Sequence, residues 1–249
     1  MTRPRTTRSG PEAPLVVYGA NAVLELLRSG GPVDRLCLGR GPREAEVSAA
    51  ARARGVRVET GERAALERLA GSPHHQGAVA VTPPFVYAPL ERLLAPSCTS
   101  ALVLDGIQDP RNLGAILRTA RALGVGGVVL PRDRSAGVTS VVAAASAGLL
   151  FGLPLVQVPN LVRAMEALKA AGFWLVGLSP RGGTPLARLE PPARPALAAG
   201  GEGEGLRPLV RRTCDFMAYI PMAPGIDSLN VGVAVAIALY ELTARRRGS

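Results

Sequence analysis

The sequence predicts an α/β protein in two parts, a small α/β/α sandwich followed by a larger domain built on a parallel sheet. Short apolar runs alternate with segments of helical period along most of the 249 residues, the pattern of repeated strand–helix units. A Pro-rich, irregular stretch at residues 82–96 interrupts this alternation and indicates a domain boundary. With 47% hydrophobic and 19% charged residues, the chain can bury two cores.

These observations divide the chain into four segments. We expect a disordered tail at residues 1–14, which are polar and Arg-rich, and a first domain at residues 15–82. Residues 83–97 are expected to be a linker and residues 98–249 the second domain. Because Pro-rich irregular segments carry few contacts, movement of one domain against the other is the default expectation.

The first domain alternates short strands with short helices. Asn21 is expected to cap its first helix, because an Asn side chain accepts hydrogen bonds from exposed backbone N–H groups at a helix start. The expected strands are residues 35–38, 56–58 and 78–81, and the expected helices are residues 22–27, 44–54 and 64–70.

The second domain repeats the alternation with longer elements. A helix at residues 113–123 has its apolar side chains on one face, and a last helix at residues 231–243 is apolar around most of its circumference. The expected strands are residues 101–105, 127–130, 155–158, 173–178, 195–199 and 217–220. Alternation of this kind favours a parallel sheet. Residues 195–199 are Ala-rich, which predicts looser packing there.

The composition favours a polyanionic partner. The formal net charge is +10 and the isoelectric point is near 10.8, and Arg contacts with phosphates drive binding to nucleic acids. Lys169 is the only lysine among 29 basic residues, so a GC-rich genome is an alternative source of this Arg excess.

Composition also narrows the class of protein. The three cysteines, Cys37, Cys98 and Cys214, have neither zinc-like nor redox-like spacing, and their odd number argues against a disulfide framework. His74 and His75 have no Cys or carboxylate in ligand register. No apolar run is long enough to span a bilayer, and the N-terminus lacks the apolar segment of a signal peptide. We therefore expect a cytoplasmic protein without a metal.

Polar residues follow the first strand of the second domain. Asn112 stands where a helix begins, so it is either a structural cap or a functional amide. Arg118 follows six residues later, with Arg111 and Arg121 on the same outer side of the helix. These arginines either form a solvated face or bind an RNA phosphate at the carboxyl edge of the sheet.

Two further patterns lie near the C-terminus. A Gly-rich loop at residues 200–205 allows close approach of the backbone to a ligand, and Glu202 within it can reach an Arg or a ribose hydroxyl. The loop has GxGxG spacing rather than GxGxxG, so it is a poor dinucleotide fingerprint. Ser228 and Asn230 open the last helix, either as caps or as hydrogen-bonding groups beside a cofactor.

Taken in order, these blocks resemble a known family. The patterns N-x5-R, G-x-E-G-x-G-L and I-P-M…S-L-N-V are similar to the three motifs of the SpoU (TrmH-like) branch of the SPOUT RNA 2′-O-methyltransferases, over residues 101–245. The first domain is similar to the substrate-binding domain that precedes the catalytic domain in many members. The residues that match it are Tyr18-Gly19, Ala22-Val23 and His75-Gln76-Gly77.

The resemblance implies a specific fold and reaction. It implies a deep trefoil knot in the C-terminal domain and a homodimer. It also implies methyl transfer from S-adenosylmethionine to a ribose 2′-hydroxyl of RNA. The members that the sequence resembles most closely methylate a guanosine of large-subunit rRNA. The matching cofactor-binding positions are Gly200, Ile220 and Leu229. The matching catalytic positions are Asn112, Arg118, Glu202, Ser228 and Asn230. Gly232 departs from the family, which commonly has Ser there.

Other functions stay open at this point. A tRNA ribose, or an rRNA adenosine whose methylation gives antibiotic resistance, could be the substrate. A non-catalytic RNA-binding relative is a further alternative, although the complete set of polar motif residues argues against it. A dinucleotide-dependent enzyme would need an early glycine motif with an acidic residue about twenty positions on, and the first strands have no such pair.

Overall fold

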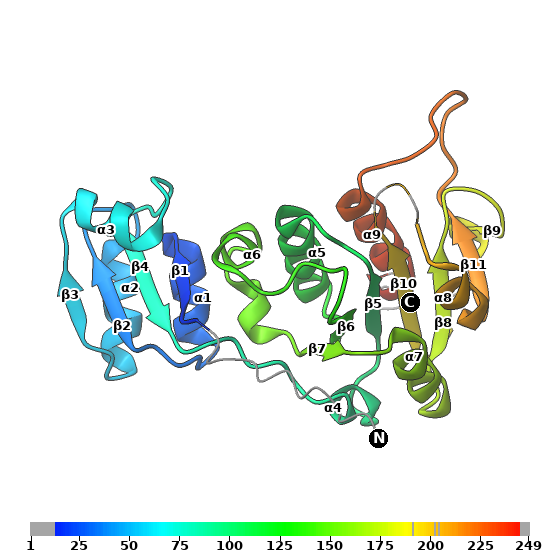
Figure 1. Cartoon of the computed structure of the whole chain (residues 1–249), viewed down its shortest axis with the longest axis horizontal. Coiled ribbons are helices and arrows are strands. Elements are labelled where there is room, and N and C mark those ends of the chain that lie inside the picture. The colour runs from blue at the N-terminus through cyan, green and yellow to red at the C-terminus, as the bar shows by residue number, and fades with distance from the viewer. Residues whose placement is uncertain (1–12, 191, 202, 204, 245–249) are drawn as a thin grey trace, which may run out of the picture.

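The computed structural model describes residues 13–190, 192–201, 203 and 205–244, which form two sheets joined by a short connection (Figure 1). The first sheet has the order β1-β4-β2-β3; β2 and β3 are parallel, and the other pairs are antiparallel. Its elements are β1 (Leu15–Tyr18), α1 (Ala20–Arg28), β2 (Arg35–Leu38), α2 (Glu44–Ala53), β3 (Val58–Thr60), α3 (Arg63–Ala70) and β4 (Ala78–Thr82).

Helices cover both faces of this first sheet. Val47 and Ala51 of α2 pack with α1 against Leu36 and Leu38, while α3 packs its Leu66 on the opposite face with neighbouring strand residues. Side chains of successive strand residues point to opposite faces, so each apolar strand supplies both layers. The predicted α/β/α sandwich is therefore confirmed.

The second sheet contains seven strands in the order β7-β6-β5-β10-β8-β11-β9, and all its pairs are parallel. Its strands are β5 (Ala101–Asp105), β6 (Val128–Pro131), β7 (Leu155–Val158), β8 (Trp174–Leu178), β9 (Thr184–Pro185), β10 (Pro195–Gly200) and β11 (Phe216–Tyr219). Its helices are α4 (Glu91–Leu94), α5 (Pro110–Ala122), α6 (Ser140–Ala145), α7 (Leu161–Ala170), α8 (Pro208–Thr213) and α9 (Val231–Leu239). Short 3₁₀ turns lie at Leu149–Gly152 and Leu186–Arg188, and a π-helical turn follows α9 at Tyr240–Ala244.

The strand order changes direction at the centre of the second sheet. β10 comes late in the chain but lies between β5 and β8, with Gly200 in register with Asp105. In parallel α/β sheets, ligands bind beyond the carboxyl ends of the strands where the strand order reverses. The chain therefore brings the end of β10 and the end of β5 together at such a point.

The packing of β10 differs from the prediction. The Ala-rich strand was expected to pack loosely, but residues 196–199 are at most 1% exposed. Larger side chains on the neighbouring strands belong to the same clusters: Leu102, Leu104 and Val176 to that of Ala199, and Val103 and Leu175 to that of Ala196 and Ala198. The Ala-rich strand is therefore fully buried in the core, beside larger residues of its neighbouring strands.

The connection between the domains is also more ordered than predicted. It contains α4, whose Leu93 is fully buried, and the backbone N–H of Ala88 donates to the carbonyl of Leu155 at 2.7 Å. The Arg194 guanidinium lies 4.0 Å from the centre of the Phe173 ring and donates to three carbonyls at the end of the connection and to a fourth at the end of α7. The expectation of few contacts was wrong, because Arg194, far along the sequence, fixes this segment.

Direct packing also joins the two domains. A Cβ added at Gly148, after α6, would lie 2.6 Å from the carbonyl oxygen of Ala22 in α1. The apolar residues of β1 and α1 form one continuous cluster with those of α5 and α6. The expectation of free domain movement is therefore not supported, because separating the domains would expose this shared core.

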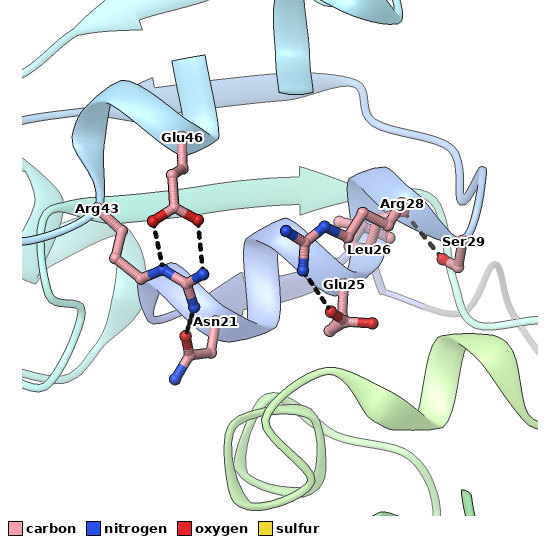
Figure 2. Close-up of polar contacts among 7 residues, drawn as sticks. All are labelled: Asn21, Glu25, Leu26, Arg28, Ser29, Arg43 and Glu46. Atoms are coloured by element: carbon pink, nitrogen blue, oxygen red, sulfur yellow. Dashed lines mark hydrogen bonds and ion pairs between the residues drawn. The ribbon is translucent and has the colours of Figure 1, made fainter. Parts of the chain in front are cut away.

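The start of α1 differs from the prediction in its cap. Gly19, with φ 97°, precedes the helix, and Asn21 lies within the first turn. Figure 2 shows the Asn21 carbonyl accepting from the Arg43 guanidinium, which also binds the Glu46 carboxylate through two bonds of 2.6 and 3.2 Å. Asn21 thus links α1 to α2 instead of capping α1.

Candidate active site

One pocket lies at the carboxyl ends of the central strands of the second sheet. It has a volume of about 330 Å³. The ends of β8 and β10, the segment between β11 and α9, and the first turns of α9 surround it. Gly200, Ile220 and Leu229, the three predicted cofactor-binding residues, all line it, and so does Ser228. Three segments that are distant in sequence thus meet around one volume.

The glycines at the end of β10 are required by backbone contacts. A Cβ at Gly200 would lie 2.0 Å from the carbonyl carbon of Gly205, and one at Gly201 would lie 2.3 Å from the carbonyl oxygen of Gly106. Gly203 and Gly205 have φ of 91° and 66°, which side chains rarely adopt. Glu202, a predicted catalytic residue, lies outside the described residues.

An ion pair between a half-exposed Arg207 and a buried carboxylate holds this loop against β5. The Asp105 side chain is fully buried, and one carboxylate oxygen accepts from Nε and Nη2 of Arg207 at 2.7 and 2.6 Å. The other oxygen accepts from the backbone N–H of Arg207 at 2.9 Å, while the Asp105 carbonyl accepts from Gly201 at 2.9 Å. Asp105 therefore anchors both ends of the glycine loop. The sequence prediction missed this residue, although a carboxylate ending an apolar strand was the available signal.

The structure brings Asn112 and Asn230 together. The Nδ2 group of Asn230 donates to Oδ1 of Asn112 at 3.1 Å, across 118 positions of sequence. This bond joins the start of α5 to the start of α9. Two blocks that were predicted to act together are thus in direct contact.

The roles of these two amides in helix capping differ. Asn112 was expected where α5 begins, but Asp109 is the N-cap, and its carboxylate accepts from the backbone N–H of Arg111 at 2.8 Å. Pro110 then fills the first helical position, where no N–H is needed. Asn112 lies inside the first turn, so its side chain is available for the contact with Asn230.

Asn230 serves as a cap and as a link at once. Its Oδ1 accepts from the backbone N–H groups of Gly232 and Val233 at 2.9 and 3.3 Å. A Cβ at Gly232 would lie only 3.1 Å from that oxygen, which gives a local reason for Gly at this position. Ser228 precedes the cap and lies on the pocket wall.

Arg118 lies apart from the pocket. It is exposed on the outer side of α5, as are Arg111 and Arg121, and it is not among the pocket-lining residues. Within the described part of the chain, it makes no hydrogen bond or ion pair. Its guanidinium is therefore free to bind an external anion.

The cysteines supply no reactive thiolate. Burial and, to a lesser extent, the adjacent Asp215 carboxylate raise the pKa of the Cys214 thiol to about 11. Burial also raises the pKa of Cys37 and of Cys98. All three therefore remain thiols near neutral pH. No set of His, Cys, Asp and Glu in the described ranges is grouped to hold a metal ion.

Family comparisons cover both domains. Residues 99–240 match the model of the SpoU rRNA Methylase family, and residues 16–88 match the model described as RNA 2′-O ribose methyltransferase substrate binding. A Staphylococcus aureus protein named for the TrmH family of tRNA/rRNA methyltransferases is 36% identical over 239 residues, covering 93% of this chain and 96% of its own. A Mycobacterium avium tRNA/rRNA methyltransferase is 38% identical over 254 residues, covering 98% and 82%.

Solved structures show the same architecture. An AdoMet-bound rRNA methyltransferase from Sinorhizobium meliloti is 28% identical with a TM-score of 0.79, over 94% of this chain and 87% of that one. The SpoU methyltransferase AviRb from Streptomyces viridochromogenes, in complex with AdoMet, is 27% identical with a TM-score of 0.79, over 95% and 92%. No helix among the residues described here is long and apolar enough to cross a membrane. The chain belongs to the SpoU rRNA methylase family and is an RNA methyltransferase.

Proposed function

We propose that this enzyme transfers a methyl group from S-adenosylmethionine to a ribose 2′-hydroxyl of RNA, and that its target is a guanosine of large-subunit rRNA. The observation that carries the proposal is the pocket at the end of β10, where Gly200, Ile220 and Leu229 converge. The substrate-binding model matched by the first domain and the rRNA in the family's description support the choice of RNA.

The residues of the pocket fit S-adenosylmethionine. The volume of about 330 Å³ lies within the usual range of ligand pockets, about 300–1,000 Å³. Apolar side chains, Leu178, Ile220 and Leu229 among them, offer surfaces for a flat base, while Ser179 and Ser228 offer hydroxyls. The glycine loop leaves backbone groups close to the volume. Gly200, Ile220 and Leu229 would hold this group.

The remaining chemistry belongs to the chain's own residues. S-adenosylmethionine supplies an electrophilic methyl group. Because a ribose hydroxyl is a weak nucleophile, the protein must align it and accept its proton. Arg118 presents five donors in a planar fork, which suits a phosphate beside the target ribose. A guanidinium holds its proton strongly, so we give Arg118 this binding role first and the role of base second.

The amides and the carboxylate would position these groups. The hydrogen bond between Asn112 and Asn230 fixes the start of α9 relative to α5, and Ser228 and Leu229 immediately precede that start. We propose that Glu202 orients Arg118 or the hydroxyl, on the basis of the family resemblance.

We propose a homodimer, and α9 supplies its contact surface. Val233, Ile237 and Tyr240 are 50%, 38% and 58% exposed and lie four and three residues apart, so they form one apolar stripe. Light scattering should report a dimer at micromolar protein. Replacement of Ile237 with Glu should shift the enzyme toward a monomer, and a parent protein that is already monomeric would contradict the proposal.

We also propose that the C-terminal segment forms a deep trefoil knot. The insertion of β10 between β5 and β8, and the return of Gly201 against Asp105, support this threading. A crystal structure traced through residues 200–244 would test it. In the same proposal, residues 15–82 bind RNA, residues 98–249 carry the catalytic site, and the enzyme acts in the cytoplasm.

Two experiments test the proposed reaction and its target. Calorimetry with S-adenosylhomocysteine should show one site per subunit, and a folded sample without binding would contradict the reaction. Ribose methylation should then be mapped in RNA from a strain that lacks the protein. Loss of one guanosine mark in large-subunit rRNA would identify the target and support a likeness to the guanosine enzyme RlmB. Loss of a tRNA mark or an rRNA adenosine mark would redirect the substrate, and RNA binding without transfer would indicate a non-catalytic relative.

A further inference from the structure

A second cavity, of about 1,010 Å³, lies in the first domain, far in sequence from the catalytic pocket. We propose that it receives an unpaired base of the RNA substrate, an inference that rests on the proposed function. Residues that line it include Arg40, Pro42, Arg63, Leu66, Pro73 and His75. The comparisons associate the first domain with substrate but assign no site within it.

The position of the cavity suits a ligand that also reaches the catalytic pocket. The cavity lies at the carboxyl ends of two parallel strands, β2 and β3. Its lining includes the three residues after β2 (39–41), the last residue of β3, Thr60, and the residue after it, Gly61. Figure 1 shows the loop between α3 and β4 on the same upper side of the molecule as the segment between β11 and α9. One RNA could therefore contact both.

Close backbone contacts fix the floor of this cavity. A Cβ at Gly41 would lie 2.4 Å from the carbonyl oxygen of Gln76, and one at Gly77 would lie 2.7 Å from that of Arg40. A Cβ at Gly39 would lie 2.7 Å from the carbonyl oxygen of Gly61. Three loops thus meet without side chains between them. A shape held in this way needs little rearrangement to bind a ligand.

His75 lines the cavity and carries a buried polar atom without a partner among the described residues. It is 4% exposed, and its Nδ1 accepts from the backbone N–H of Gly77 at 3.1 Å. In the neutral imidazole, this bond places the proton on Nε2, which has no hydrogen-bond partner among the described residues. A buried N–H group without an acceptor is unfavourable. Nε2 has less than 1 Å² of accessible surface, so a base contacts it only after the His75 side chain turns toward the cavity, and the gain of an acceptor favours that turn.

The remaining lining favours a base over a phosphate. The two arginines of the lining, Arg40 and Arg63, are matched in charge by Glu44 and Glu62. Arg63 also pairs with Glu67 at 3.0 Å. Prolines, Leu66 and glycine backbone make much of the wall. Proteins read unpaired RNA through bases that are turned out of the stack and hydrogen-bonded at their edges. Carbonyl oxygens and ring nitrogens of such bases are the acceptors that Nε2–H requires.

Spectroscopy on the full-length protein tests occupancy directly. The chain has only two histidines, so a long-range ¹H–¹⁵N spectrum shows two imidazoles, which the His74→Asn variant assigns. Titration with the four nucleoside 5′-monophosphates should move the Nε2 signal of His75 to saturation for at least one base. Inorganic phosphate alone should leave that signal unchanged. A response to phosphate equal to the response to nucleotides would overturn the assignment to a base.

Affinity measurements test whether RNA uses the cavity. His75→Asn keeps an acceptor for the Gly77 N–H group but removes Nε2, and Thr60→Trp fills the cavity from its exposed rim. Each should weaken binding of a short unpaired RNA by roughly tenfold, the scale of one base contact. Ala49→Trp, on the exposed part of α2 outside the cavity lining, is the matched control and should bind as the parent does.

The outcomes separate this inference from the proposed function. Both cavity variants should retain the parent's affinity for S-adenosylhomocysteine. If the parent binds RNA and both folded variants bind it equally well, the cavity has no role and the inference is overturned. If only Thr60→Trp folds, its RNA affinity alone tests the inference: weaker binding supports a role of the cavity, and parent-like binding overturns it. If the parent binds S-adenosylhomocysteine but no RNA, the proposed substrate class itself fails.

Discussion

Asp105→Asn should destabilise the enzyme and loosen the glycine loop beside the pocket. The substitution keeps the shape of the side chain but removes its charge and turns one acceptor into a donor. Three donors of Arg207 converge on the two carboxylate oxygens at 2.6–2.9 Å, so an amide cannot satisfy all of them. The backbone bond from Gly201 to the Asp105 carbonyl remains, but the side-chain contacts between residue 105 and Arg207 are weakened.

The expected magnitude follows from burial. Breaking a fully buried ion pair costs about 3–5 kcal/mol, and a hydrogen bond to a charged group contributes about 1.5–3 kcal/mol. The Asp105 side chain is fully buried, but that of Arg207 is 40% exposed and can be hydrated after the substitution. We therefore expect a loss of about 2–3 kcal/mol in the free energy of unfolding. Affinity for S-adenosylhomocysteine should fall roughly tenfold, equivalent to about 1.4 kcal/mol acting on the loop.

Urea denaturation and calorimetry measure the two effects. Glu59→Gln is the control, since Glu59 pairs with Arg35 at 2.8 Å on an exposed surface and should show no measurable change. Arg207→Lys should be milder than Asp105→Asn, because it keeps the charge and the backbone N–H group. A free energy of unfolding within about 0.5 kcal/mol of the parent, with unchanged affinity, would refute the claim that this pair anchors the loop.

Substitutions at four further residues test other parts of the account. Gly200→Ala should abolish S-adenosylhomocysteine binding in calorimetry, because its Cβ would collide with the Gly205 backbone at 2.0 Å; parent-like affinity would show that the loop adapts. Asn230→Ala should lower the free energy of unfolding by about 1–2 kcal/mol in urea, through loss of a helix cap and a side-chain bond, whereas a neutral result would deny both. Arg118→Ala should reduce methyl transfer roughly a hundredfold and retain cofactor affinity, and Arg118→Lys should rescue RNA affinity more than rate; near-parent transfer would move the catalytic role elsewhere. Folding raises the pKa of the Cys214 thiol from 9.0 to about 11, so its contribution to stability is present below pH 9 and is lost as pH rises from 9 to 11. Cys214→Ala should therefore flatten the dependence of the free energy of unfolding on pH between 9 and 11. An unchanged pH dependence would contradict the raised pKa.

The sequence was most informative where function depends on the order of local patterns. Gly200, Ile220 and Leu229 were grouped because they match the cofactor-binding positions of the family that the sequence resembles, and in the structure all three line one pocket. The strands that were predicted lie within two residues of their observed positions, because apolar runs bounded by turn residues mark them directly, but β1 and the two-residue β9 were not predicted. That these residues bind the cofactor stays a prediction.

Contacts between distant segments could not be predicted in the same way. The pairing of Asp105 with Arg207 depends on the return of the chain after β10, which no local pattern encodes. The sequence left Asn112 open as a cap of α5 or a functional amide, and it did not reveal that Asp109 followed by Pro110 takes the cap position. The contacts of Arg194 along the connection likewise join residues about a hundred positions apart, as its bonds to Cys98 and Leu94 show.

The central claim is transfer of a methyl group to a ribose hydroxyl, and the fate of a labelled methyl group tests it most directly. The enzyme should be incubated with total bacterial RNA and S-adenosylmethionine carrying a tritiated methyl group, and the product then hydrolysed in alkali. Since a 2′-O-methyl group removes the hydroxyl that attacks the adjacent phosphate, the account predicts label in alkali-resistant dinucleotides that contain guanosine. Label recovered in single nucleotides methylated on the base, or no incorporation by a protein that binds the cofactor, would contradict it.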